Sequence, residues 1–568
     1  MTDLRQAALD WIAGDVDHKT RDELQAILDS GDPGTLQAAM GATLEFGTAG
    51  IRGQVGPGSN RMNRAMVIRT TAGLVSFLDS LPDSDANAPV VVGFDARPSS
   101  RTLAEDTAGV LAAAGRRVLY FPEVTPTPLV AFAGNKSGAI ASVVVTASHN
   151  PPADNGYKVY ATNGAQIVPP WDTGISAAIS GVGPANQIPR VERVFAGGSP
   201  LVSEVGPSVL DRYWEEVDSA RPEPQKSTLK IVYTPMHGVG GAVLTSVFAR
   251  AGHEGLMSVP EQAEPDGAFP TVSFPNPEEE GALDLALALA VDREADVVIA
   301  NDPDADRLAA AVPLAGEWRL LSGNELGALL GDYVLRNWKS DDRAIVANSI
   351  VSSPILGRIA EQYGARFEVT LTGFKWIVNA VLALEADGEG TFAFGFEEAL
   401  GYTVGRTVRD KDGISAALVF VDLVAGLSKE GKTVLDRLVD IWREVGLWVS
   451  AQHSIVRTGG EGRSAIQSAV NRLGDDPPES LGGFEVTAVE DYRTGGEGRP
   501  FWLGNQALIQ MTLGDSGRIL VRPSGTEPKL KVYVDLTTAV GSDPAASQHA
   551  AEGSARALAA QVGEWLGI

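Results

Sequence analysis

The sequence predicts a multidomain α/β protein, and three observations lead to that expectation. The chain has 568 residues, more than one hydrophobic core of about 250–300 residues accommodates. After Gly41, short runs of β-branched residues alternate with amphipathic helical segments, an order typical of βαβ units and a largely parallel sheet. This order begins three times, whereas the last segment has two β-rich stretches and one helix. We therefore expect three α/β blocks followed by a smaller α+β domain.

The first forty residues predict a helical extension at the surface. Leu24, Ile27 and Leu28 recur at helical spacing, and Thr20-Arg21-Asp22-Glu23 has the form of a capping box. The first α/β block, predicted over 41–205, follows this extension. Its expected elements are strands at 90–96, 117–121 and 139–151 and a helix at 101–115.

The two following blocks repeat the strand–helix order. The second block, 206–318, is expected to contain strands at 229–235 and 295–307 and helices at 239–251 and 280–291. The third block, 319–450, is expected to contain strands at 343–351, 367–373 and 391–402 and helices at 354–364 and 374–386. The C-terminal domain, 451–568, should hold two β-rich stretches within 518–537 and a helix over 544–566. Polar loops follow the last strand of each α/β block, where open α/β sheets bind ligands.

The composition narrows the classes of partner. With 46 basic and 72 acidic side chains the net charge is −26, which argues against nucleic acid or an anionic membrane as the main partner. The chain has no cysteine, which excludes disulfides, thiolate metal sites and thiol nucleophiles. Its longest apolar runs are interrupted by Asp284 and Asp422, and its N-terminus lacks the pattern of a signal peptide. We expect a cytoplasmic protein without a membrane partner.

The loop Thr146-Ala147-Ser148-His149-Asn150-Pro151 follows a predicted buried strand. Ser148 beside His149 fits a nucleophile with a neighbouring acid/base, although Ser, Asn and Pro are also common in plain polar turns. The chain lacks the Gly-x-Ser-x-Gly elbow, which counts against an α/β-hydrolase.

The loop Asp302-Pro303-Asp304-Ala305-Asp306-Arg307 carries carboxylates at alternate positions. Three acids this close repel one another unless a cation lies between them, and Mg²⁺ prefers oxygen ligands of this kind. An EF-hand would need Gly at its sixth position and Glu at its twelfth, where this chain has Arg307 and Pro313. The pattern therefore predicts a metal site, with a solvated acidic turn as the weaker interpretation.

Two further loops carry candidate binding groups. Glu397 and Glu398 follow an apolar strand and could accept hydrogen bonds from sugar hydroxyls or cap the next helix. The segment Arg522-Pro523-Ser524-Gly525-Thr526 offers cationic, hydroxyl and amide donors around a glycine, which suits a phosphate monoester as well as a simple hairpin turn.

In this order, the four loops resemble those of the α-D-phosphohexomutase superfamily, from about Leu44 to the C-terminus. The stretches that support the resemblance are LEFGTAGIRG (44–53), NGYKVY (155–160), YTPMHGVGG (233–241), LSGNELGALLGDY (321–333) and LTGFKWI (371–377). The motifs FGTAGIRG, TGFKWI and FEEALGY are similar to those of bacterial phosphoglucomutase/phosphomannomutase enzymes and of their phosphopentomutase-like relatives.

The resemblance implies three similar mixed-sheet α/β domains plus a smaller C-terminal α+β domain around a central cleft. It implies an isomerase that interconverts hexose 1-phosphate and hexose 6-phosphate, with glucose as the first expectation and mannose accepted. Phosphoserine at Ser148 would donate to the sugar and give a hexose 1,6-bisphosphate, which also acts as activator. A phosphopentomutase acting on ribose or deoxyribose 1-phosphate is the alternative within the family.

The resemblance also implies roles for individual residues. Phosphorylated Ser148 and the three aspartates, Asp302, Asp304 and Asp306, would hold Mg²⁺, with Arg52 and Arg307 beside the transferred phosphoryl group. The sugar hydroxyls would bind Glu397 and Glu398. The remaining phosphate would bind Arg522, Ser524, Gly525 and Thr526. His149, Lys158 and Lys375 match positions implicated in proton handling or substrate contact, and the general acid/base among them is left open.

Two other classes of protein compete with this interpretation. A Mg²⁺-dependent sugar phosphatase would use the aspartates but would not need a distal phosphate loop around Ser524. A non-catalytic sugar-phosphate-binding protein would have no use for Ser148 together with three metal-binding aspartates. We expect a small-molecule sugar phosphate as partner, no nucleic acid, and a monomer or homodimer.

Overall fold

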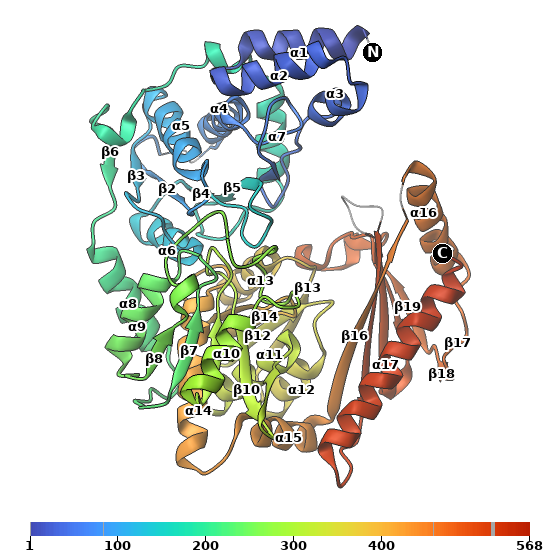
Figure 1. The fold of residues 1–568 in the computed structure, drawn as a ribbon. Coiled ribbons are helices and arrows are strands. Elements are labelled where there is room, and N and C mark those ends of the chain that lie inside the picture. The colour runs from blue at the N-terminus through green and yellow to red at the C-terminus, as the bar shows by residue number, and fades with distance from the viewer. Residues whose placement is uncertain (1, 83–84, 458, 524–528) are drawn as a thin grey trace. The chain divides into compact units, whose positions relative to one another are not determined.

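The computed structural model describes residues 2–82, 85–457, 459–523 and 529–568 (Figure 1). The chain divides into two compact units, and each is described here by itself. The first comprises Met1–Leu320 and Tyr402–Val419, and the second comprises Leu321–Gly401 and Phe420–Ile568. No helix among the described residues is both long and apolar enough to cross a membrane.

The first unit begins with the expected helical extension: α1 (Thr2–Gly14), α2 (His18–Ser30) and α3 (Pro33–Met40). They pack around Ala8, Leu24 and Leu28. The predicted capping box is wrong, because α2 already starts at His18, where the Asp17 carboxylate accepts a hydrogen bond from the Lys19 amide. Thr20 lies inside the helix and donates to Asp15 instead.

The first sheet has the strand order β1-β5-β4-β2-β3-β6. Its strands are β1 (Ile51–Gln54), β2 (Val90–Phe94), β3 (Val118–Tyr120), β4 (Ala141–Val145), β5 (Asp154–Tyr160) and β6 (Val202–Glu204). Helices α4 (Arg64–Ser80), α5 (Ser100–Ala113), α6 (Thr127–Ser137) and α7 (Trp171–Ser180) accompany it, with short 3₁₀ turns at Ala185–Gln187 (η1) and Val194–Ala196 (η2). The valine-rich strands β2 and β4 are parallel and wholly buried, as a central strand requires. β5 is antiparallel to both β1 and β4, so the sheet is mixed.

The second sheet has the order β11-β10-β9-β7-β8. It contains β7 (Ile231–Thr234), β8 (Leu256–Ser258), β9 (Val297–Ala300), β10 (Ala309–Leu314) and β11 (Glu317–Leu320), with α8 (Ser208–Ala220), α9 (Gly241–Ala251), η3 (Pro260–Gln262) and α10 (Asp284–Arg293). β7 is parallel to β8 and β9, whereas β10 is antiparallel to both of its neighbours. The predicted domain boundary between residues 318 and 319 therefore falls inside β11.

A segment from the predicted third block completes the first unit. It contains most of β15 (Gly401–Val404) and the start of α14 (Gly413–Lys429). The Tyr213 hydroxyl of α8 donates to both carboxylate oxygens of Asp412, at 3.0 and 2.9 Å. The Tyr160 hydroxyl of β5 donates to Asp410 at 2.7 Å. These buried contacts join the segment to elements that precede it by about 200 residues or more.

The second unit contains a parallel sheet with β12 (Ala344–Ser349) between β13 (Arg366–Thr370) and β14 (Thr391–Glu397). Helices α11 (Gly323–Arg336), α12 (Ile355–Gln362), α13 (Phe374–Ala386) and α15 (Val434–Val445) belong to it. The predicted strands and helices of the third block are all present, but the expected strand 391–402 is two strands, because the turn after Glu397 separates β14 from β15.

The C-terminal sheet is antiparallel and has the order β16-β22-β21-β20-β19. Its strands are β16 (Leu447–Val456), β19 (Ala488–Asp491), β20 (Ile509–Thr512), β21 (Gly517–Pro523) and β22 (Lys529–Thr538). The C-terminal domain also contains a separate pair of short strands, β17 (Ser480–Leu481) and β18 (Phe484–Glu485). Its helices are α16 (Gly459–Asp475) and α17 (Pro544–Leu566), and its 3₁₀ turns are Gly496–Gly498 (η4), Phe501–Leu503 (η5) and Gly514–Ser516 (η6). The predicted domain start at 451 lies within β16, which pairs with β22 from Leu447↔Thr538 to Val456↔Lys529. The three α/β domains and the α+β C-terminal domain are confirmed as the fold class.

Candidate active site

Ser148 lies just beyond β4 in a buried, left-handed turn. Its φ angle is 50° and it is 3% exposed. The Ser148 amide donates to Thr146 Oγ1 at 2.9 Å, and its hydroxyl donates to Asp302 Oδ2 at 2.8 Å. A left-handed residue other than glycine costs about 1–3 kcal/mol, and strained residues of this kind cluster at active sites. The turn therefore directs the Ser148 hydroxyl at the aspartate loop.

Arg97 holds this turn in place, and sequence reasoning missed it. The buried guanidinium donates to four backbone carbonyls, those of Ser148 (2.7 Å), Asn150 (2.6 Å), Pro151 (2.6 Å) and Asp154 (2.9 Å). Asp95 pairs with Arg97 Nε at 3.2 Å. Arg97 follows β2, whose carboxyl end lies beside that of β4, so a charged residue after the neighbouring strand was the signal available in the sequence.

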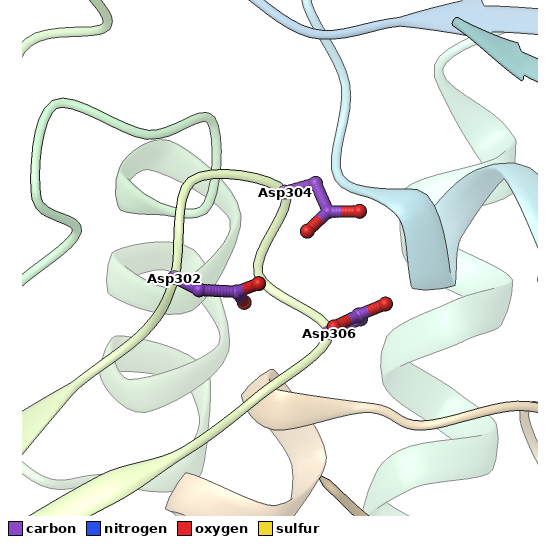
Figure 2. A group of neighbouring side chains, drawn as sticks. All are labelled: Asp302, Asp304 and Asp306. Atoms are coloured by element: carbon purple, nitrogen blue, oxygen red, sulfur yellow. The ribbon is translucent and has the colours of Figure 1, made fainter. Parts of the chain in front are cut away.

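The three predicted metal-binding aspartates lie together after β9, and Figure 2 shows their side chains projecting from one loop. Asp302, Asp304 and Asp306 are 0%, 0% and 1% exposed, and one carboxylate oxygen of each lies within 4.8 Å of the others. Among the described residues, Asp304 Oδ1 and Asp306 Oδ1 are buried without a hydrogen-bond partner. Buried unpaired acceptors of this kind fit a hard divalent cation such as Mg²⁺.

Lys158 already provides part of the positive charge that these carboxylates need. From β5, its ammonium donates to Asp304 Oδ2 at 2.6 Å and to Asp306 Oδ2 at 3.1 Å. Burial alone would lower the pKa of Lys158, but Asp304 and Asp306 outweigh it and the pKa is raised. Burial and the neighbouring carboxylates raise the pKa of Asp302 well above its ordinary value. Burial also acts to raise the pKa of Asp304, but Lys158 keeps it below the usual range.

Arg307, Arg52 and His149 surround the same group. Arg307 Nε lies 4.0 Å from Asp302 and 3.9 Å from Asp306. Arg52, on β1, donates to Asn150 Oδ1 at 2.9 Å. His149 Nδ1 lies 3.2 Å from the Ser148 hydroxyl, and burial together with the positive charges of Arg307 and Arg52 lowers the pKa of His149 to about 2. His149 is therefore neutral here.

Lys411 is a second functional candidate that sequence reasoning missed. Its ammonium lies 3.3 Å from Asp306 and 3.2 Å from Asp410, and Asp410 also accepts the Tyr160 hydroxyl. The motif Arg409-Asp410-Lys411-Asp412 was the available signal, but nothing in its local pattern shows that it contacts a loop about 100 residues earlier.

The remaining predicted site residues belong to the second unit. Glu397, at the end of β14, accepts a hydrogen bond from the Gly373 amide at 2.7 Å. Glu398 accepts from the hydroxyls of Ser349 (3.2 Å) and Ser352 (2.9 Å). Lys375 lies in the first turn of α13.

Arg522 lies on β21. Burial, with the Glu398 charge, raises the pKa of Tyr533 on β22 to about 12, and Arg522 acts in the opposite direction. The predicted phosphate ligands Ser524, Gly525 and Thr526 lie outside the described residues.

Comparison with known protein families accounts for most of the chain. Four family models described as phosphoglucomutase/phosphomannomutase match in order. Three are alpha/beta/alpha domains I, II and III, which match residues 43–183, 211–315 and 322–445, and the fourth is the C-terminal domain, at 485–540. The helices α1–α3 precede the first match.

Comparison with individual proteins also finds proteins named as phosphosugar mutases. The chain is 42% identical over 493 residues to a probable phosphomannomutase of Haemophilus influenzae, covering 85% of this chain and 94% of that protein. It is 38% identical over 571 residues to a phosphopentomutase of Homo sapiens, covering 95% and 93%. The crystal structure of a putative phosphomannomutase from Thermus thermophilus shares the fold, with a TM-score of 0.69 at 21% identity, covering 93% of this chain and all of the other.

Proposed function

This chain belongs to the phosphoglucomutase/phosphomannomutase family, and from that premise we propose that it moves a phosphoryl group between two hydroxyls of one sugar by way of Ser148. Phosphoserine 148 donates its phosphoryl group to a hydroxyl of a sugar monophosphate. The P–O bond to Ser148 breaks, a P–O bond to the sugar forms, and the proton of the sugar hydroxyl ends on the Ser148 oxygen. The resulting sugar bisphosphate returns its other phosphate to Ser148, which completes the isomerisation.

The contact between Ser148 and the aspartate loop carries this proposal. A hydroxyl 2.8 Å from one of three buried carboxylates, in a strained turn held by Arg97, is an arrangement that a sugar-binding protein without catalysis would not need. Asp302, Asp304 and Asp306 would hold Mg²⁺, which supplies charge neutralisation for the transferred group when bound. Arg52 and Arg307 would face the same group as fixed positive charges.

The protonation states suggest how the two side chains act. Lys158 is held as a cation by Asp304 and Asp306, and because its pKa is raised it can offer a hydrogen bond and a fixed positive charge to a leaving oxygen but is a poor proton donor. His149 is neutral and lies 3.2 Å from the Ser148 hydroxyl, so it can act as a hydrogen-bond partner of that oxygen. We assign charge stabilisation to Lys158 and an orienting role to His149.

For the sugar, we propose a pentose 1-phosphate as the preferred substrate. The sequence favoured a hexose because Glu397 and Glu398 could each accept a sugar hydroxyl. Ser349 and Ser352 already donate to Glu398, and the Gly373 amide donates to Glu397, which weakens that argument. The human phosphopentomutase aligns with 95% of this chain, against 85% for the probable phosphomannomutase, although the latter is more identical.

Hexose 1-phosphate, with glucose preferred and mannose accepted, is the second candidate. The observation that favours it is the higher identity, 42%, to the probable phosphomannomutase. Comparison of kcat/KM for ribose, glucose and mannose 1-phosphates, each with Mg²⁺ and its own bisphosphate, separates the two. We expect ribose 1-phosphate to lead by at least tenfold, about 1.4 kcal/mol of transition-state preference. A tenfold lead for a hexose reverses the assignment.

The phosphoryl carrier has its own test. The intact mass of active protein should show one phosphate, and Ser148→Ala should lose both that phosphate and mutase turnover. Ser142→Ala, the same change at a buried position on β4, is the matched control and should keep both. Turnover by Ser148→Ala would refute the mechanism, and steady release of inorganic phosphate from the sugar by the wild type would favour the phosphatase class instead.

A further inference from the structure

A cavity lies in the first unit where the N-terminal helices meet the first sheet domain. Its volume is about 500 Å³, within the range of small-molecule sites. Its walls are α1, the end of α3 with the connection that follows, α4 and the segment 182–185. The lining includes Trp11, Met40 and Arg69 and none of the residues of the Ser148 and aspartate group.

Arg69 is the unusual feature of this cavity. Its Nη2 donates to the Val182 carbonyl at 3.3 Å, and the guanidinium lies 5.6 Å from the centre of the Trp11 ring. In the part of the chain that the structure describes, its Nε is buried without a hydrogen-bond partner, and no carboxylate forms an ion pair with it. Burial lowers the pKa of Arg69, and no neighbouring carboxylate opposes that effect.

Two other arginines that are at least partly buried are neutralised by the protein itself. Arg64, five residues earlier on α4, pairs with Asp106 at 2.7 Å, and Arg437 pairs with Asp332 at 2.6 Å. Burying a charge without a partner is costly, and the chain has an excess of acidic residues from which a partner could have come. A guanidinium left without a carboxylate beside a cavity is therefore suited to an anion that comes from outside the chain.

The other lining residues narrow the class of anion. Trp11, Ala7, Met40 and Ala65 offer apolar surface. Asp10 and Asp15 also line the cavity and repel any anion, but they repel a dianion such as a phosphate monoester about twice as strongly as a monoanion. We propose that this cavity binds a small organic monoanion, a carboxylate with an apolar body, whose charged end pairs with Arg69 and whose body packs against Trp11.

The site is separate from the mutase reaction. The first family domain begins at residue 43, so α1 and the end of α3 add a wall that the family's domains do not include. The binding proposal therefore stands or falls independently of the proposed function.

Binding of phenylacetate, followed by calorimetry and by saturation-transfer NMR, tests the proposal on the full chain. The neutral isostere phenylacetamide has the same shape without the charge. We expect saturable phenylacetate binding, at least tenfold weaker binding of the amide, and at least tenfold weaker phenylacetate binding by Arg69→Met. Arg101→Met is the matched control, because Arg101 also lies over an aromatic ring, Phe94 at 5.7 Å, and donates to a carbonyl, that of Pro122 at 3.0 Å.

Two further variants keep the test decisive if Arg69→Met folds poorly. Arg69→Lys keeps the charge and should retain binding to within about tenfold. Ala7→Trp, at an exposed position of α1, adds bulk to the cavity and should abolish binding without changing Arg69.

Three results would overturn the proposal. One is equal binding of acid and amide, and another is unchanged binding in both Arg69→Met and Ala7→Trp. The third is no saturable binding of phenylacetate up to about 20 mM, a concentration well above a millimolar dissociation constant. Tighter binding of inorganic phosphate than of phenylacetate, lost in Arg69→Met, would contradict the choice of a carboxylate.

Discussion

Replacing Lys158 by methionine should destabilise the metal-free protein far more than an ordinary loss of an ion pair. The Lys158 ammonium is 2.6 Å from Asp304 and 3.1 Å from Asp306, and the three side chains are 7%, 0% and 1% exposed. Breaking a buried pair by removing one partner costs about 3–5 kcal/mol, because the other charge stays buried without compensation. For a unit of about 340 residues with an unfolding entropy of about 2.1 cal/mol/K per residue, this corresponds to a fall in melting temperature of roughly 4–7 °C.

The assay is thermal unfolding of wild type and Lys158→Met, followed by circular dichroism, first with a chelator and then with saturating Mg²⁺. A divalent cation between the aspartates would replace the lost positive charge, so Mg²⁺ should raise the melting temperature of the variant more than that of the wild type. Together, the two measurements detect Mg²⁺ binding at the aspartates without an activity assay.

Lys136→Met is the matched control. Lys136 lies 2.7 Å from Glu216, but these side chains are 26% and 34% exposed, and such a surface pair contributes only about 0–1 kcal/mol. If Lys158→Met costs no more than Lys136→Met, or if Mg²⁺ leaves the difference between variant and wild type unchanged, the reasoning about this buried charge group is wrong.

Further predictions concern the metal, the serine turn and pH. Asp304→Asn should weaken Mg²⁺ binding at least tenfold by isothermal titration while circular dichroism shows an unchanged fold, because one of three anionic ligands becomes neutral. Arg97→Met should lower kcat and reduce the free energy of unfolding by about 3–5 kcal/mol in urea denaturation, because Asp95 stays buried without its partner. Burial lowers the pKa of His237, so just below pH ~6.5 the unfolded chain binds a proton that the folded protein does not. Stability that is present above that pH is therefore lost as the pH falls toward the lowered pKa. Urea unfolding at pH 7.5, 6.5 and 5.5 should show a shallower fall for His237→Gln, whereas His549→Gln, at an exposed position of α17, should behave as wild type.

Local sequence pattern determined much of the secondary structure. The expected C-terminal helix over 544–566 is α17 (Pro544–Leu566), and the buried strands β2 and β4 lie inside their expected ranges. Strands buried on both faces are continuous apolar runs, which are easy to recognise. β16 was missed because its sequence, LWVSAQHSIV, is neither a continuous apolar run nor a regular alternation of apolar and polar residues.

The aspartate group could also be predicted, because its three carboxylates lie within five residues of one loop. Their repulsion, which makes a cation between them favourable, is a local property. The positions of Ser148 in TASHNP and of the aspartates in DPDADR, at the ends of strands, were likewise visible in the sequence.

Only the tertiary structure decided which other side chains complete the site. Arg97 contacts residues 51 to 57 positions away, and Lys158 contacts aspartates 146 and 148 positions away. Lys411 comes from a segment that lies, in sequence, within the third block but packs with the first unit. Such pairings depend on how strands and loops that are distant in sequence come together in the fold. A single sequence shows which residues are charged but not which of them pair, because the stabilising charge–charge contacts exist only once the chain has folded.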